Sequence, residues 1–161
     1  RAIGFIGHIP QKDETINEHR FNGYLGALRK AGIEYDDSLV VNTILTATGG
    51  YQATKTLISR GKIPTAIFCS NDTVAMGVLK ALDEAGIHVP NDLSLIGFDN
   101  IEATAFTKPA LTTIDIPKRD LGRLAVKTLL DRIESKRTFP ISVRLPFTLI
   151  RRESCKEVAD E

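Results

Sequence analysis

Polar side chains follow the short apolar runs of the chain, at positions where they could make hydrogen bonds to a small ligand. The set holds one guanidinium together with carboxylates, amides and hydroxyls. A guanidinium donates a fork of hydrogen bonds, a carboxylate accepts from two hydroxyls, and an amide does both. This mixture suits a neutral, polyhydroxylated ligand. In chain order the residues are His8, Asn17, Arg20, Asn22, Thr43, Thr46, Thr48, Ser70, Asn71, Asp72, Asp99 and Asn100.

Each of these side chains also has a purely structural explanation. Asn71 and Asp72 stand where a helix is expected to begin, so they could serve only as its cap and its first-turn carboxylate. Asp99 and Asn100 could serve only to form a turn. Taken singly, such residues are more often structural than functional, so the case for a site depends on whether the fold brings them together.

The sequence motifs of common enzymes are absent. The chain has no GxGxxG for a dinucleotide, no GxxxxGK[ST] for a nucleoside triphosphate and no GxSxG for a hydrolase. His8, His19 and His88 are far apart and lack a ligand-like spacing to cysteines or carboxylates. Gly49 and Gly50 before a helix could cradle a phosphate, although a two-glycine turn is common. We therefore expect no catalysis, no metal and no cofactor.

The elements that must position these residues alternate along the chain. Short β-rich runs are followed by amphipathic stretches with apolar residues at helical spacing. Strand–helix–strand units of about 30 residues require parallel pairing with right-handed crossovers, which predicts an α/β fold with a doubly wound parallel sheet. Ligands of such sheets bind outside the carboxyl ends of the strands. Strands are expected at residues 2–6, 39–43, 66–69, 93–98 and 112–116, an extended stretch at 141–149, and helices within 14–31, 50–59, 70–85 and 118–134.

Composition supports a folded domain and excludes several classes of protein. The 161 residues are 42% hydrophobic and 25% charged, with a net charge of +1, so neither wholesale disorder nor bulk attraction to nucleic acid is expected. No apolar run reaches the about 18–20 residues that span a bilayer. Cys69 and Cys155 lack a CxxC partner and indicate reduced thiols in a cytosolic protein. The chain begins at Arg1 and enters a strand at once, and we expect it to continue a longer protein.

Four stretches of the sequence resemble the effector-binding core of the LacI/GalR family of bacterial transcriptional regulators. They occur in the order and spacing of that family and, with the helices that link them, cover nearly the whole chain. They are residues 20–32 (RFNGYLGALRKAG), 64–77 (PTAIFCSNDTVAMG), 89–100 (VPNDLSLIGFDN) and 109–114 (PALTTI).

The resemblance implies a periplasmic-binding-protein-like fold of type I, in which two α/β subdomains enclose a sugar or nucleobase. It implies that residues 1–112 form the second, C-terminal effector-binding subdomain. Residues 113–137 would be a strand and helix that cross into the first subdomain, and residues 138–161 would be the return strand and tail. The helix-turn-helix and most of the first subdomain would precede Arg1. The wide apolar face of the helix at 118–134 is then expected to need a cover, supplied by association or exchange with another chain.

The resemblance also assigns roles to particular residues. Arg20, Asn71 and Asp99 match effector contacts, and Asn22 is a weaker candidate on the same helix face. Leu45 stands where the family often has an aromatic ring that stacks on the ligand, so a small sugar is expected rather than a purine. A homodimer interface is expected to include Met76 and Phe106.

The expected function is therefore effector binding and dimerisation in a LacI/GalR-type regulator, a cytoplasmic repressor that makes no membrane contact. It would bind operator DNA only through an N-terminal domain that this chain lacks. The alternative is a sugar-binding receptor of a bacterial uptake transporter, which shares the fold and would carry a signal peptide in place of the helix-turn-helix.

Overall fold

Strands and α-helices alternate along the chain from Ile3 to Phe98, as the apolar pattern predicts. The computed structural model describes residues 1–10 and 19–157. In chain order the elements are β1 (Ile3–Gly7), α1 (His19–Lys30), the 3-10 turn η1 (Asp37–Leu39), β2 (Val40–Asn42), α2 (Ala47–Ser59), β3 (Ala66–Cys69), α3 (Asp72–Glu84), β4 (Ser94–Phe98), the 3-10 turn η2 (Glu102–Ala105), β5 (Thr112–Asp115), α4 (Lys118–Glu134) and β6 (Thr148–Ile150).

The strands form one sheet in the order β2-β1-β3-β4-β5-β6. The first five strands are parallel, and β6 pairs antiparallel with β5 at one edge. The predicted α/β fold with a doubly wound sheet is confirmed, with an antiparallel strand added at that edge. The strand order reverses between β1 and β3, which is the position where open sheets of this type bind ligands.

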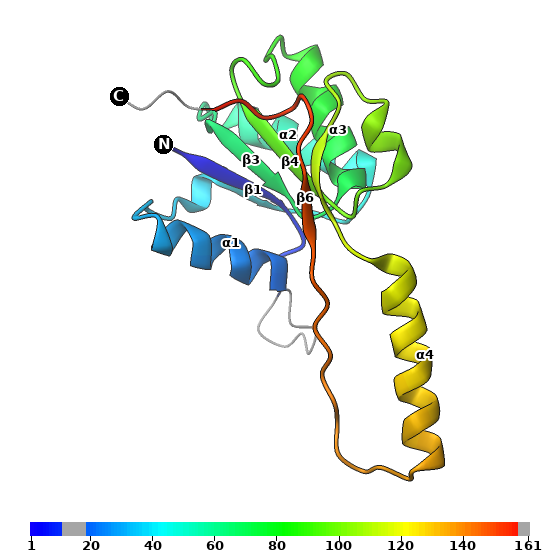
Figure 1. The fold of residues 1–161 in the computed structure, drawn as a ribbon. Helices are drawn as coiled ribbons and strands as arrows, with labels where there is room; N and C mark the ends of the chain where they lie inside the picture. The colour runs from blue at the N-terminus through cyan, green and yellow to red at the C-terminus, as the bar shows by residue number, and fades with distance from the viewer. Residues whose placement is uncertain (11–18, 158–161) are drawn as a thin grey trace.

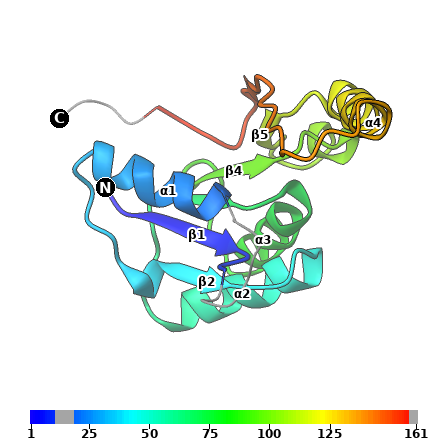
Figure 2. The same ribbon diagram turned by 90° about the horizontal axis from the view of Figure 1, so that it is seen from below.

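Helices cover both faces of the sheet. Figure 2 shows α1 on one side of β1, with α2 and α3 on the other side. On the α1 side the ring of Phe5 lies 5.1 Å from that of Phe21 and 5.4 Å from that of Tyr24, measured between centroids. The opposite face buries aliphatic side chains of β1, α2 and α3, including Ile6, Leu57, Val74, Val78 and Leu82.

Helix α2 begins at Ala47, three residues before the expected start at Gly50. The reason is a cap, because the hydroxyl of Thr46 accepts a hydrogen bond from the backbone N–H of Gly49 at 3.0 Å. The two glycines therefore lie inside the helix. A Cβ added to Gly50 would stand 2.1 Å from the carbonyl oxygen of Val74. Close packing of α2 on α3 accounts for this glycine, so a phosphate cradle is not needed to explain it.

Residues 117–147, which we call the arm, extend away from the body of the molecule. Figure 1 shows α4 projecting beyond the sheet, with the chain returning beside it to β6. No residue of α4 is buried, and Leu121, Leu129 and Ile133 are each between 50% and 63% exposed. The wide apolar face expected for this helix is therefore present and remains largely exposed in the single chain. None of the helices described is long and apolar enough to cross a membrane.

Candidate ligand-binding site

Arg20 lies in the first turn of α1, beside the carboxyl ends of β3 and β4. Its Nη1 atom donates a 2.6 Å hydrogen bond to the carbonyl oxygen of Ser70, which directly follows β3. Its guanidinium carbon lies 5.1 Å from the centre of the Phe98 ring, at the end of β4, a distance at which cation and ring attract each other. These contacts place Arg20 next to the two residues that precede Asn71 and Asp99.

Asp99 presents its carboxylate at the same edge of the sheet. Burial raises the pKa of Asp99 above its usual range, while the positive charge of Arg20 acts in the opposite direction. Among the described residues no group donates a hydrogen bond to this carboxylate. Its oxygens are therefore available to accept hydrogen bonds from ligand hydroxyls.

Asn71 serves as the N-cap of α3, and it retains donors for a ligand. Its Oδ1 atom accepts a 2.8 Å hydrogen bond from the backbone N–H of Val74. The Nδ2 hydrogens of Asn71 have no acceptor within the part of the chain that the structure describes. The structural and functional explanations of this residue are therefore compatible, because each uses a different end of the amide.

Arg20, Asn71, Phe98 and Asp99, which we call the strand-end site, come from α1 and from the ends of β3 and β4. The side chains offer a planar fork of donors, an amide donor, a carboxylate acceptor and an aromatic ring. This combination is chemically suited to a neutral hydroxylated molecule, which it could hold through hydrogen bonds and one apolar surface. Of the sequence candidates, Arg20, Asn71 and Asp99 are brought to one edge of the sheet. Their roles toward a ligand remain predictions.

Asp72 belongs to the polar set found in the sequence, but the fold assigns it to the interior. It is fully buried, its Oδ1 accepts a 2.6 Å hydrogen bond from the hydroxyl of Thr113, and its Oδ2 accepts one from the N–H of Ile101 at 2.9 Å. Burial raises the pKa of Asp72, which those hydrogen bonds and the nearby charge of Arg152 partly offset. Asp72 therefore joins the start of α3 to β5 and to the loop that follows β4.

The remaining ligand candidates lie further from this centre. Asn22 is on the exposed surface of α1, two residues after Arg20. Leu45 lies in the loop that follows β2, where it is 38% exposed, and its neighbour Ile44 is 70% exposed. Neither residue carries an aromatic ring, so these two side chains offer no ring on which a ligand could stack. Asn17 falls outside the described residues.

Phe98 and Arg152 near the strand-end site were missed by the sequence reasoning, and the contacts of Asn100 were not predicted. Phe98 was taken only as the apolar end of a strand, although its ring lies under Arg20. Asn100 was expected either to contact a ligand or to form a turn, and in the structure its side chain bonds both Arg152 and Asp115. Arg152 gave no local signal, because its partner Asn100 is 52 positions away in the sequence.

The two residues expected at a dimer interface lie on the body of the molecule. Met76 is partly exposed on α3, and Phe106, just after η2, is 79% exposed. A ring exposed to this extent is compatible with a contact surface, and the interface itself remains a prediction.

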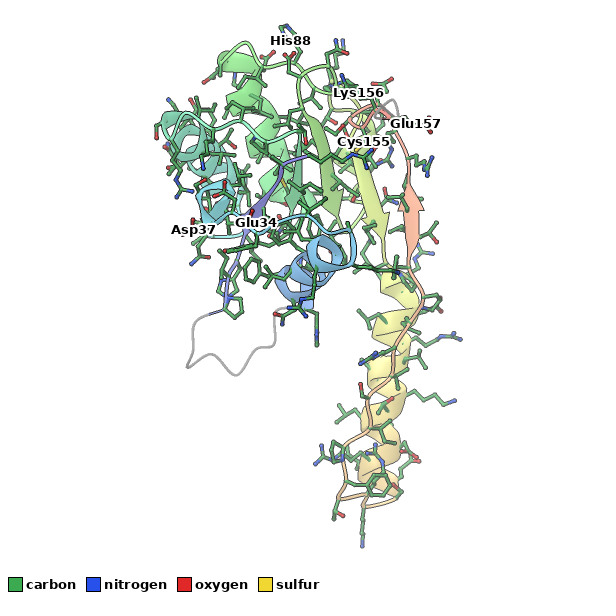
Figure 3. The ribbon with its side chains drawn as sticks, turned by 90° about the vertical axis from the view of Figure 1, so that its left-hand side faces the viewer. Glu34, Asp37, His88, Cys155, Lys156 and Glu157 are labelled. Atoms are coloured by element: carbon green, nitrogen blue, oxygen red, sulfur yellow. The ribbon has the colours of Figure 1, made fainter. Side chains whose placement is uncertain are left out.

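Other reactive side chains lie away from the strand-end site. Figure 3 shows His88, Cys155 and Lys156 at the end of the sheet opposite to α4. Lys156 is held there by its backbone N–H, which donates to the hydroxyl of Ser94 at the start of β4. Residues 1–10 and 19–157 contain no group of three or more His, Cys, Asp or Glu side chains that could hold a metal ion.

Comparison with known proteins finds similarity along nearly the whole chain. Residues 1–155 match the family model described as periplasmic binding protein-like domain. The chain is 41% identical over 150 residues to the HTH-type transcriptional repressor PurR of Escherichia coli, an alignment that covers 92% of this chain and 44% of that protein.

Solved structures of regulators have the same fold. The transcriptional regulator CelR, in complex with cellobiose, superposes with a TM-score of 0.87 at 31% identity, covering 96% of this chain and 46% of CelR. A LacI family regulator from Enterococcus faecium with bound ribose superposes with a TM-score of 0.81 at 35% identity, covering 96% of this chain and 56% of that one.

The chain thus spans less than half the length of the curated relatives it matches. The named relatives are transcriptional regulators and not enzymes.

Proposed function

The chain belongs to the family of periplasmic binding protein-like domains, and we propose that it is the effector-binding and dimerising portion of a LacI/GalR-type transcriptional repressor. The similarity to PurR and to two further regulators supports a regulator over a receptor of an uptake transporter. The domain would perform no chemistry. It would bind a small ligand, and binding would change the conformation of the rest of the protein.

The observation that carries this proposal is the position of Arg20 between the ends of β3 and β4. The guanidinium is fixed by the Ser70 carbonyl and the Phe98 ring, so it is already ordered before a ligand arrives. The Asp99 carboxylate, to which none of the described residues donates a hydrogen bond, lies close enough to interact with the charge of Arg20. A cation and an anion held at the same end of the sheet can each bond a different hydroxyl of one ligand, and the prior order of Arg20 reduces the entropy cost of binding.

We propose that the ligand is a small sugar. The strand-end site offers polar groups and one ring, and the loop after β2 carries Ile44 and Leu45 in place of an aromatic side chain. A large aromatic ligand would lack a second ring to stack on. Two similar regulators are described with cellobiose and with ribose bound, which supports the same class of ligand here.

We propose that different segments of the chain belong to two different subdomains. In this proposal residues 1–112 form the effector-binding subdomain, residues 113–137 cross into another subdomain, and residues 138–161 return and end the chain. The support comes from α4, whose apolar side chains are largely exposed in this chain, since Leu129 and Ile133 are 58% and 63% exposed. Large exposed apolar patches on soluble proteins mark contact surfaces.

The rest of the regulator completes the mechanism we propose. DNA would be bound by a separate N-terminal domain in the cytoplasm, and two copies would associate through surfaces that include Met76 and Phe106. Ligand at the strand-end site would favour one relative position of the subdomains and so alter DNA affinity. Such coupling is typically about 1–3 kcal/mol.

Thermal shift of the full-length protein with a panel of sugars that includes D-ribose and cellobiose tests the proposal. At least one sugar is expected to raise the Tm, and Arg20→Ala is expected to remove that rise because the donor fork is lost. Arg29→Ala is the matched control, since Arg29 is exposed in the last turn of the same helix. A rise that survives intact in Arg20→Ala would contradict the site.

The arm has a separate test. In solution, the 161-residue chain is expected to self-associate, because α4 exposes its apolar face. The paired substitution Leu129→Glu and Ile133→Glu should reduce the association, measured by multi-angle light scattering. A folded monomer of the unsubstituted chain at micromolar concentration would count against an uncovered arm.

A further inference from the structure

The turn after β4 has a backbone conformation that needs external support. Asp99 and Asn100 have φ angles of +108° and +48°, in the region that favours glycine. Asn tolerates the second of these values, but the first is unusual for any residue with a side chain. Such conformations persist only where the surroundings hold them, and Asp99 is a member of the strand-end site.

Three contacts hold Asn100, the second residue of the turn. Its Oδ1 accepts a hydrogen bond from Nη2 of Arg152 at 2.8 Å, and its Nδ2 donates one to Oδ1 of Asp115 at 3.1 Å. Its backbone N–H donates to the hydroxyl of Thr113 at 3.3 Å. The amide thus lies between a cation on its acceptor side and a carboxylate on its donor side, which fixes its orientation.

Arg152 is itself fixed from several directions. Its Nη1 donates to the carbonyl of Leu111 at 2.7 Å and to the hydroxyl of Thr104 at 3.0 Å. Its backbone N–H donates to the hydroxyl of Thr112 at 3.0 Å. The guanidinium therefore has one fixed arrangement, in which it reaches Asn100 with its remaining amino group. A lysine ammonium lacks this planar fork and cannot reproduce all three side-chain contacts.

Because of the position of Arg152 in the chain, these contacts also connect the turn to the arm. Arg152 follows β6, the strand by which the chain returns from the arm (Figure 1). Asp115, the other side-chain partner of Asn100, ends β5, from which the chain leaves for the arm. Asn100 is thus bonded to both connections between the body and the arm.

We propose that Arg152 is a positioning residue for Asp99: by holding Asn100 it fixes the turn that presents the Asp99 carboxylate, and it joins that turn to the return strand of the arm. The inference rests on the proposed function in one respect, namely that Asp99 contacts the ligand. A displacement of β6 relative to β5 would move Arg152, release Asn100 and change the presentation of the carboxylate.

The positioning is tested without any ligand by NMR of the 161-residue chain. The ¹³C chemical shifts of Asp99 and Asn100 report their backbone conformation, and Arg152→Lys is expected to move both away from left-handed values. Arg151→Lys is the matched control, because Arg151 is the exposed neighbour in the same segment. Tyr24→Phe controls for general loss of stability, since Tyr24 packs on the opposite face of the sheet from α3. Unchanged shifts at Asp99 and Asn100 in Arg152→Lys would overturn the proposal.

The consequence for binding is measured in the full-length protein with D-ribose and cellobiose by calorimetry. For a sugar that binds, Arg152→Lys is expected to raise the Kd about tenfold, and Arg151→Lys is expected to leave the Kd unchanged. An unchanged Kd in Arg152→Lys, alongside altered shifts, would show that the turn does not serve the ligand. If neither sugar binds the unsubstituted protein, that result counts against the proposed sugar, while the chemical shifts still decide whether Arg152 positions Asp99.

Discussion

The hydroxyl of Thr113 donates a 2.6 Å hydrogen bond to the carboxylate of Asp72, and both side chains are fully buried. Thr113 belongs to β5, and Asp72 is the first residue of α3, the helix that follows β3. The bond therefore joins β5 to a helix whose preceding strand lies two places away in the sheet. The second oxygen of Asp72 accepts from the N–H of Ile101, beyond the Asp99–Asn100 turn. One carboxylate therefore connects three parts of the molecule next to the strand-end site.

Replacing Thr113 with valine keeps the shape of the side chain and removes the donor. Because the Asp72 carboxylate is then buried with one oxygen short of a partner, the free energy of unfolding is expected to fall by about 1–3 kcal/mol. Urea unfolding followed by circular dichroism measures the change. Thr56→Val is the control, because Thr56 is exposed on α2 and its hydroxyl donates to the Gln52 carbonyl one turn earlier. An equal loss in both variants would contradict the argument.

Gly97 in β4 has no room for a side chain. A Cβ there would lie 2.2 Å from Oδ1 of Asp72 and 3.0 Å from Cδ2 of Leu111, so Gly97→Ala is expected to lower the free energy of unfolding by at least about 1–3 kcal/mol. Gly23→Ala provides the contrast. Gly23 lies inside α1 with nothing within 4 Å of the added atom, and alanine there should raise stability by roughly 0.5–1 kcal/mol. Denaturant midpoints that shift in the same direction would argue against this packing.

Tyr24 should make stability depend on pH in the alkaline range. Its hydroxyl donates to the Ile3 carbonyl at 2.8 Å, and burial raises its pKa from 10.0 to about 12. The folded chain therefore holds this proton more tightly than the unfolded chain, so the stabilisation is complete below pH 10 and is lost as the pH rises toward about 12.

Ultraviolet titration of phenolate absorption measures this prediction. The chain has three tyrosines, and Tyr24→Phe is expected to remove the component that titrates at the highest pH. The substitution should also flatten the fall of the free energy of unfolding between pH 10 and 12. Titration of Tyr24 together with the other two tyrosines would contradict its burial.

Much of the fold was predictable because it follows from local patterns. Apolar runs and helical periodicity identified the alternation, and α4 has the expected bounds of Lys118 and Glu134. Gly32, Gly61 and Gly86 have positive φ angles after the helices they end, a conformation that glycine adopts without steric cost. The start of α2 was missed because it depends on the cap by Thr46 and on contact with α3, neither of which a periodicity reveals.

The site was predictable only where it follows from strand ends. Arg20, Asn71 and Asp99 belong to the larger set of polar residues expected where parallel strands end, and the resemblance to a known family singled them out from that set. Phe98 and Arg152 were missed because their roles come from pairings distant in sequence, and an arginine after an edge strand has no signal of its own. The burial of Asp72 likewise follows from tertiary packing on β5.

The contact between α2 and α3 limits how the strand-end site can adapt. A Cβ on Gly77 would stand 1.9 Å from the carbonyl oxygen of Ala47, and one on Gly50 would stand 2.1 Å from that of Val74, so the two helix backbones touch directly. The loop that holds Leu45 and the cap residue Asn71 therefore belong to one rigid block. The separation of Leu45 and Asn71 is thereby set by a contact between helix backbones, and we expect it to stay constant when ligands of different size bind.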